Sequence, residues 1–231
     1  MFKVLGRYSI YAFMIAFGSV SMMLIAEQLP AGLQFERLII DLGVTTSEFS
    51  PVEILQNILL LICISLFGWI ASRDRLRRPM ALSFCVLFLV CFVREMDFFL
   101  DFYVVDNLWQ VVCALLFAIT FVYLGRHWHR FEQGLRRSWP STGLAIIMSG
   151  FILLVPFAQL MGHNLLWQEI MGENYVRVVK VAVEEFIELG AYAILTIGSI
   201  EFLYSWARLP QTRKLHARIK PKRYRPNLNL R

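Results

Sequence analysis

Six apolar segments constrain the fold of this chain more than any other feature. A membrane-spanning helix needs about 20 predominantly apolar residues to cross a hydrocarbon core of about 30 Å, and each segment is long enough. Of the 231 residues, 58% are hydrophobic and 17% are charged, whereas an ordinary soluble domain has about 25% charged residues. The sequence therefore predicts an all-α integral membrane protein, a six-transmembrane-helix bundle. Its spans are expected near residues 9–29, 52–72, 80–103, 108–125, 143–162 and 178–206.

Basic residues gather in alternate connections between these spans. The N-terminus, the second and fourth connections and the C-terminal tail together hold 19 of the 23 Lys and Arg residues, whereas 14 of the 17 acidic residues fall on the other side. By the positive-inside rule, the basic connections face the cytoplasm. We therefore expect an N-in/C-in topology, a transmembrane domain over residues 1–207 and a basic cytoplasmic tail over residues 208–231. This plain charge pattern and the small size favour a bacterial inner (plasma) membrane.

The predicted sixth span contains an unusual run of carboxylates in Val181–Gly190, VAVEEFIELG. Glu and Asp inside a membrane are expensive unless they are paired, protonated or facing a water-filled cavity, so they indicate a functional site. Helical spacing places Lys180, Glu184 and Glu188 on one stripe, with Glu185 beside it. We expect this stripe to form one wall of a polar site.

The predicted third span repeats the anomaly in the sequence VREMDFFLD. Arg94, Asp97 and Asp101 are spaced by three and then four residues, so a continuous helix would place them on one stripe, with Glu95 turned about 100° away. Arg94 is expected to pair with Asp97 along its own helix. Glu95 should find its partner on another helix. The two charged stripes are expected to meet at one depth in the outer half of the membrane.

The second span opens with Ser50-Pro51-Val52-Glu53, a capping box with proline in the first helical position, which gives Glu53 a structural explanation. Gln56 and Asn57 lie one turn deeper and are amides of the kind that join membrane helices. The preceding outer loop, Pro30–Ser50, is suited to a short interfacial helix or a lid. Pro156 predicts a kink in the fifth span because it has no N–H to donate.

Acids outnumber cations in the combined constellation. If all its groups were ionised, the site would carry an excess negative charge that burial and close like charges disfavour. Some carboxylates must therefore be protonated, hydrated or bound to a cation. The candidate catalytic residues are Glu95, Glu184, Glu185 and Glu188. The candidate substrate-binding or ion-pair residues are Arg94, Asp97, Lys180 and Glu53. A divalent cation, if bound, is expected at Glu95, Glu185, Glu188 and His163.

Three classes of function fit this pattern. The first is a membrane enzyme in which a bound cation activates water against a lipid or another membrane substrate. The second is a proton- or cation-linked transporter, although the inner half of the spans is nearly free of polar groups until Glu201. The third is a non-catalytic assembly or accessory protein in which the acids form a polar lock between helices. The leading expectation is an acidic, outward-facing site that binds a cation or protons.

The lipid bilayer is the expected surroundings of the chain, and the basic tail is expected to bind anionic lipid headgroups. No nucleic-acid partner is expected, because no folded domain accompanies that tail. His127 and His129 lie two residues apart, a poor spacing for shared metal ligation on a helix, and are expected to be solvated. The sequence leaves the oligomeric state open.

Overall fold

The computed structural model describes residue 6 and residues 9–18, 51–139 and 141–219. The predicted outer loop Pro30–Ser50, the end of the predicted first span and the last part of the tail lie outside these residues. Within the described ranges every regular element is helical, and no strand is present. The predicted all-α fold class is therefore confirmed for this part of the chain.

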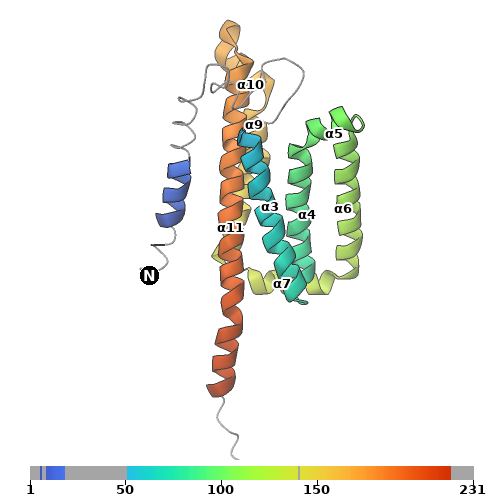
Figure 1. The fold of residues 1–231 in the computed structure, drawn as a ribbon, viewed down its shortest axis with the longest axis vertical. Helices are drawn as coiled ribbons and strands as arrows, with labels where there is room; N and C mark the ends of the chain where they lie inside the picture. The colour runs from blue at the N-terminus through green and yellow to red at the C-terminus, as the bar shows by residue number, and fades with distance from the viewer. Residues whose placement is uncertain (1–5, 7–8, 19–50, 140, 220–231) are drawn as a thin grey trace, which may run out of the picture.

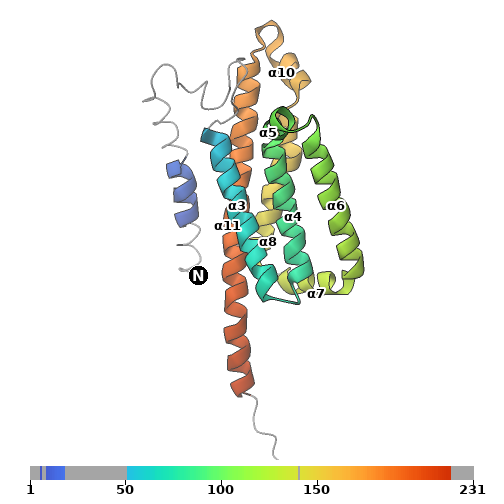
Figure 2. The same ribbon diagram turned by 45° about the vertical axis from the view of Figure 1, so that its right-hand side comes forward.

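The helices form an elongated bundle in which α3, α4, α6 and α11 run side by side (Figures 1 and 2). The short elements α5 and α10 lie at one end, and α7 crosses the opposite end. A further helix, Ser9–Gly18, precedes the bundle. The numbered elements are α3 (Pro51–Arg73), α4 (Arg78–Glu95), α5 (Asp97–Tyr103), α6 (Leu108–Arg126), α7 (Trp128–Ser138), α8 (Thr142–Ile152), the π-helical turn η1 (Leu153–Ala158), α9 (Gln159–Met161), α10 (Asn164–Met171), the 3-10 turn η2 (Gly172–Asn174) and α11 (Arg177–Ile219).

Four helical stretches are long and apolar enough to cross a membrane. They correspond to the predicted second, fourth, fifth and sixth spans. The helix α4 runs beside them but carries charged residues at both ends, and Ser9–Gly18 is a shorter apolar helix. The chain is therefore a helical protein suited to a membrane. The four stretches are Val52–Arg73, Leu108–Arg126, Thr142–Met161 and Val179–Arg208.

The predicted third span is divided into two helices. The backbone at Met96 has φ −103° and ψ 14°, which ends α4 after Glu95, and α5 begins at Asp97. The Met96 amide donates to the carbonyl of Val93 at 3.3 Å, as in a closing helical turn. A single helix over residues 80–103 is therefore wrong. Arg94 and Asp97 belong to different helices and do not share one continuous stripe.

Aromatic packing joins three of the long helices. The buried ring of Phe67 on α3 has its centroid 5.4 Å from that of Phe202 on α11 and 5.2 Å from that of Phe84 on α4. Phe88, one turn further along α4, lies 5.6 Å from Phe67. Offset aromatic contacts at these distances are favourable beyond the area that they bury. They fix α3 and α4 against the middle of α11.

Glycine residues allow α8 and α11 to touch along their backbones. A Cβ atom added at Gly198 of α11 would lie 2.8 Å from the backbone nitrogen of Ile147 on α8, closer than real Cβ atoms approach. One added at Gly150 of α8 would lie 2.7 Å from Cγ of Leu195. Small residues permit such close approach between membrane helices, where van der Waals packing drives association. This contact fixes the rotation of α11 in the bundle.

Pro156 lies in η1, the π-helical turn between α8 and α9. Proline donates no backbone hydrogen bond, and a wider turn accommodates the missing donor without ending the helix. The predicted irregularity in the fifth span is therefore found at Pro156. It takes the form of a π-helical turn.

Asp74 organises the end of the bundle that α7 crosses. Its Oδ1 accepts from the backbone amides of Leu76 and Arg77 at 3.0 and 3.2 Å, and its Oδ2 accepts from Arg77 Nη1 at 2.8 Å and from the Trp206 indole at 3.2 Å. Arg77 Nε in turn donates to Ser138 of α7 at 3.1 Å. Burial by itself raises the pKa of Asp74, but the hydrogen bonds and the Arg77 charge outweigh burial and hold the pKa below its usual value.

Candidate intramembrane carboxylate site

The acids of α11 differ in their polar partners. Glu184 pairs with Lys180 at 2.8 Å, and its carboxylate packs against Gly162 after α9. Glu185, Glu188 and Tyr192 are spaced by three and four residues and use their polar groups toward α3 and α4. Lys180, Glu184 and Glu188 follow one another at intervals of four residues in the continuous helix α11, so they share one stripe as predicted, but Glu184 pairs with Lys180 whereas Glu188 pairs with Arg94 of α4.

Arg94 lies at the centre of the second group. Its Nη2 donates to Glu188 Oε1 and lies 3.6 Å from Glu95 Oε1, so one guanidinium contacts carboxylates from α4 and α11. The Tyr192 hydroxyl donates to Glu95 Oε1 at 2.6 Å. The expected off-helix partner of Glu95 and the expected meeting of the two charged helices are both confirmed. We refer to Arg94, Glu95, Glu185 and Glu188 as the carboxylate cluster.

Burial is uneven across the carboxylate cluster. The side chains of Glu188 and Glu95 are only 3% and 7% exposed, whereas that of Arg94 is 37% exposed. The carboxylates are therefore removed from solvent, and the guanidinium lies at the boundary of the cluster.

Gln56 brings α3 into the same network. This residue is fully buried, and its Nε2 donates to the Glu185 carboxylate at 3.0 Å and to the Glu185 backbone carbonyl at 3.3 Å. Because both partners are acceptors, the network fixes the orientation of the amide. The other amide atom, Oε1, is buried and has no donor among the described residues. An acceptor in this state has room for one further hydrogen bond.

Small polar groups continue along α11 below Tyr192. Thr196 Oγ1 donates to the Tyr192 carbonyl at 2.8 Å, and Ser199 Oγ donates to the Leu195 carbonyl at 2.7 Å. Cys63 of α3 lies 3.4 Å from Thr196 Oγ1. These hydroxyls are satisfied by the backbone one turn earlier, as is common for Ser and Thr in helices. They do not extend the charged cluster.

The electrostatic character of the site follows from its composition. Three carboxylates, Glu95, Glu185 and Glu188, interact with one guanidinium, so the cluster would carry a net charge of −2 if every group were ionised. Glu184 is neutralised separately by Lys180. An uncompensated charge away from water is unfavourable by several kcal/mol. The arrangement therefore favours binding of positive charge.

The proposed metal ligands are not assembled as a set. Within the described residues, no group of three or more His, Cys, Asp or Glu side chains is arranged to hold a metal ion. His163 is exposed and directly precedes α10. Glu53 lies half-buried in the first turn of α3, and Asp97 opens α5. The described residues therefore do not place His163 with Glu95, Glu185 and Glu188 in a set that could hold the predicted divalent cation.

Two residues of the network were not among the predicted site residues, Tyr192 and Gln56. Tyr192 follows Glu188 by four positions and Glu185 by seven, so helical periodicity alone places its hydroxyl on their face. Gln56 was noticeable as an amide in an apolar helix. What the sequence could not supply was the rotation of α3 against α11.

Comparison with models of known protein families, with curated proteins and with solved structures gives no match.

Proposed function

We propose that this chain is a six-span protein of a bacterial inner membrane, with both termini in the cytoplasm, and that its carboxylate cluster binds protons from the outer side. The charge distribution along the bundle supports this orientation. The carboxylate cluster lies where α4 ends and α11 begins, toward α5 and α10, whereas the arginine-rich turn after α3 lies beside α7 at the opposite end (Figure 2). Basic connections on one side are what the positive-inside rule requires.

The observation that carries the proposal is the sharing of Arg94 by buried carboxylates. Glu188 and Glu95 both contact the guanidinium, and the polar partner of the Glu185 carboxylate is the Gln56 amide. A neutral amide cannot offset a negative charge. Two protons on the cluster would remove this excess without requiring another residue, and carboxylate groups inside membranes commonly serve as proton relays.

The buried Oε1 atom of Gln56 gives a second reason. This acceptor lacks a donor within the described part of the chain, and an unsatisfied buried acceptor is unfavourable by about 1–3 kcal/mol. A carboxylate offers no donor, whereas a carboxylic acid or a hydrated cation offers one. Uptake of protons or of a hydrated cation would therefore supply both positive charge and a hydrogen-bond donor.

Infrared spectroscopy of the full-length protein in lipid bilayers tests this proposal. The carbonyl band of protonated carboxylic acids should be present in the wild type at neutral pH. It should be lost or strongly reduced in Glu185→Gln, because Glu185 lacks a cationic partner of its own. Glu184→Gln is the matched control and should retain the band, since Glu184 is already paired with Lys180. A wild type with no such band would refute the proton site.

A cation is the alternative occupant, and calorimetric titration with Mg²⁺, Ca²⁺ or Zn²⁺ distinguishes it. Binding that Glu185→Gln abolishes and Glu184→Gln preserves would assign the cluster to a cation.

A polar lock is the competing function, because the network joins α3, α4 and α11. It predicts that Gln substitutions lower stability, with neither a protonated band nor cation binding in the wild type.

A further inference from the structure

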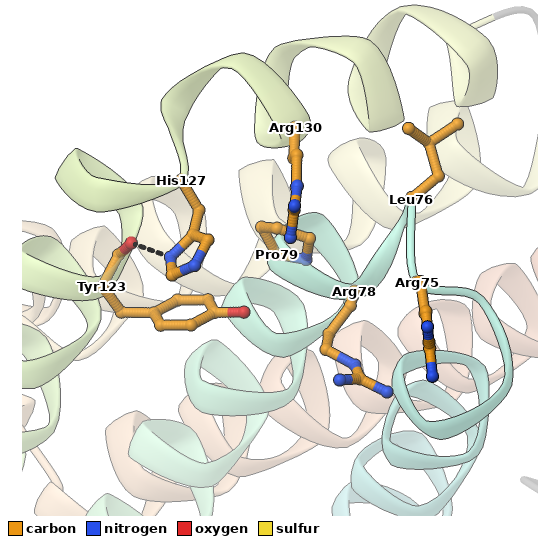
Figure 3. Close-up of a pocket in the computed structure, with 7 residues that line it drawn as sticks. All are labelled: Arg75, Leu76, Arg78, Pro79, Tyr123, His127 and Arg130. Carbon is orange, nitrogen blue, oxygen red and sulfur yellow. Dashed lines mark hydrogen bonds between the residues drawn. The ribbon is translucent and has the colours of Figure 1, made fainter.

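A cavity of about 670 Å³ lies at the end of the bundle opposite to the carboxylate cluster. Three segments form it: the turn after α3, the start of α4 and the junction of α6 with α7 (Figure 3). Its volume falls within the range of about 300–1,000 Å³ that is usual for small-molecule sites. We call it the basic pocket.

Three guanidinium groups line the basic pocket, from Arg75, Arg78 and Arg130. Arg78 Nε donates to the Ala71 carbonyl at 2.9 Å, which positions this side chain and leaves its Nη groups for another partner. Arg75 and Arg130 have no hydrogen-bond or ion-pair partner within the described ranges. Because the nearest acid in sequence, Asp74, is bound by Arg77 and Trp206, the pocket has uncompensated positive charge.

The remaining wall combines apolar and aromatic groups. His127 Nδ1 lies 3.0 Å from the Tyr123 carbonyl, and the two rings have their centroids 4.5 Å apart. The carbonyl can only accept, so this contact requires a proton on Nδ1 and fixes the imidazole at the pocket wall. Leu76 and Pro79 add apolar surface. The pocket therefore suits an anion that is attached to an apolar body.

The position of the pocket relative to the candidate spans identifies where such a ligand would come from. Val52–Arg73 and Leu108–Arg126 both end within a few residues of it. Phe121 and Val122, on the last turns of α6, are 81% and 55% exposed and offer apolar surface next to the pocket. This is the depth at which phospholipid headgroups lie, with acyl chains along the adjoining helix surface.

We propose that the basic pocket binds a phosphate group carried by the headgroup of an anionic phospholipid. Arginine is well suited to this ligand because its planar N–H donors match phosphate oxygens in pairs. The site is separate from the carboxylate cluster and does not depend on what that cluster binds. A free phosphate ion presents the same oxygens to the arginines, and the experiment below distinguishes it from the lipid headgroup.

The test uses the full-length protein in detergent micelles and isothermal titration calorimetry with three probes: short-chain phosphatidic acid, short-chain phosphatidylcholine and inorganic phosphate. Phosphatidic acid should bind, and Arg75→Gln or Arg130→Gln should weaken its binding about tenfold through loss of a charge-assisted hydrogen bond. Arg137→Gln is the matched control, since it removes the same charge from an exposed position of α7 outside the pocket.

Each probe has a defined consequence. Pocket-dependent binding of phosphatidic acid without binding of inorganic phosphate supports the lipid headgroup. Equal, pocket-dependent binding of inorganic phosphate supports the phosphate site and overturns the lipid source. The proposal fails if neither phosphate probe binds, if Arg137→Gln weakens binding as much as Arg130→Gln, or if phosphatidylcholine binds as tightly as phosphatidic acid.

Discussion

Arg94 is the residue on which the carboxylate cluster depends, because it is the cation that contacts both Glu95 and Glu188. Removing one partner of a buried ion pair leaves an uncompensated charge, whereas removing both partners together avoids it. The contribution of the carboxylate cluster to the free energy of unfolding is therefore best measured by comparing a double variant with the corresponding single variants.

Arg94→Gln is expected to lower the free energy of unfolding by about 1–3 kcal/mol, less than the loss for a fully buried pair because the Arg94 side chain is 37% exposed. The double variant Arg94→Gln/Glu188→Gln should lose less stability than Arg94→Gln alone, because it no longer contains the buried Glu188 carboxylate that Arg94→Gln leaves without its cation. Unfolding in mixed micelles with increasing denaturing detergent measures both, with Arg137→Gln as an exposed control. Losses that simply add in the double variant would show that Arg94 and Glu188 are not coupled.

Asp74 makes a second residue-scale prediction, on pH dependence. The pKa of Asp74 in the folded protein lies below the ordinary value of an aspartate, so ionisation stabilises the fold. That stability is present above the unfolded pKa and is lost as the pH falls through the folded pKa. The wild type should therefore exceed Asp74→Asn in unfolding free energy by a constant amount above about pH 5, and by less below about pH 4.

Thermal unfolding of both proteins across this range measures the difference. Glu132→Gln, which removes an exposed acid from α7, serves as the control. A difference between wild type and Asp74→Asn that is unchanged at low pH would mean that the Asp74 carboxylate does not stabilise the fold through its charge.

At this scale the sequence predicted residue types better than partners. The expected off-helix contact of Glu95 is present, as a hydrogen bond from Tyr192. His127 was expected to be solvated, yet it is half-buried beside Tyr123. The difference has a physical reason: spacing along a helix fixes which face a residue occupies, but the partner depends on how neighbouring helices are rotated.

Among the elements, α8 and α11 form the contact most sensitive to side-chain size. Gly198→Ala is expected to lower the unfolding free energy by about 1–3 kcal/mol, because its Cβ would meet the Ile147 backbone and cannot be relieved by a rotamer change. Gly190→Ala on the same helix is the matched control, since a Cβ there meets nothing within 4 Å. It should be neutral or slightly stabilising, given the higher helix propensity of alanine.

The same detergent-induced unfolding experiment compares the two alanine variants. Equal losses at both positions would indicate that the loss at Gly198 does not come from helix packing, because Gly190 has no close neighbour and alanine has the higher helix propensity. Gly150→Ala would place its Cβ against Leu195 and is a further variant of the same α8–α11 interface.

Element boundaries were predictable where composition changes sharply. The arginine-rich connections coincide with the ends of α3 and α6, and the second, fourth, fifth and sixth spans have apolar counterparts among the helices. The division of the third span at Met96 was not predictable, because VREMDFFLD contains no proline or glycine to interrupt a helix. The short α5 packs against α6 after the break, and tertiary contacts of this kind override local propensity.

For the whole molecule, orientation in the membrane is the property that the charge pattern predicts. Lys and Arg gather near α7 and in the tail, and acids gather toward α5 and α10. Since basic loops are retained on the cytoplasmic side, α7 should be cytoplasmic and η2 should lie outside. Six spans return the C-terminus to the side of the N-terminus, whereas an odd number would separate them.

Labelling of single cysteines in intact cells tests this arrangement. The native cysteines Cys63, Cys85, Cys91 and Cys113 are free and at least half-buried, and they are first replaced by alanine. Glu173→Cys in η2 should react with a membrane-impermeant maleimide, because that position is exposed and the proposed topology places it on the outer side. Gln133→Cys in α7 is equally exposed but should react only after the cells are opened.

Lys3→Cys and Lys222→Cys extend the experiment to the two ends of the chain, and both should behave as Gln133→Cys does. Labelling of Lys3→Cys alone from outside would give an odd number of spans and would remove the first predicted span from the bundle. Labelling of Gln133→Cys from outside with Glu173→Cys protected would invert the whole protein. The carboxylate cluster would then open to the cytoplasm and the basic pocket to the exterior, so the proposed direction of proton access depends on this result.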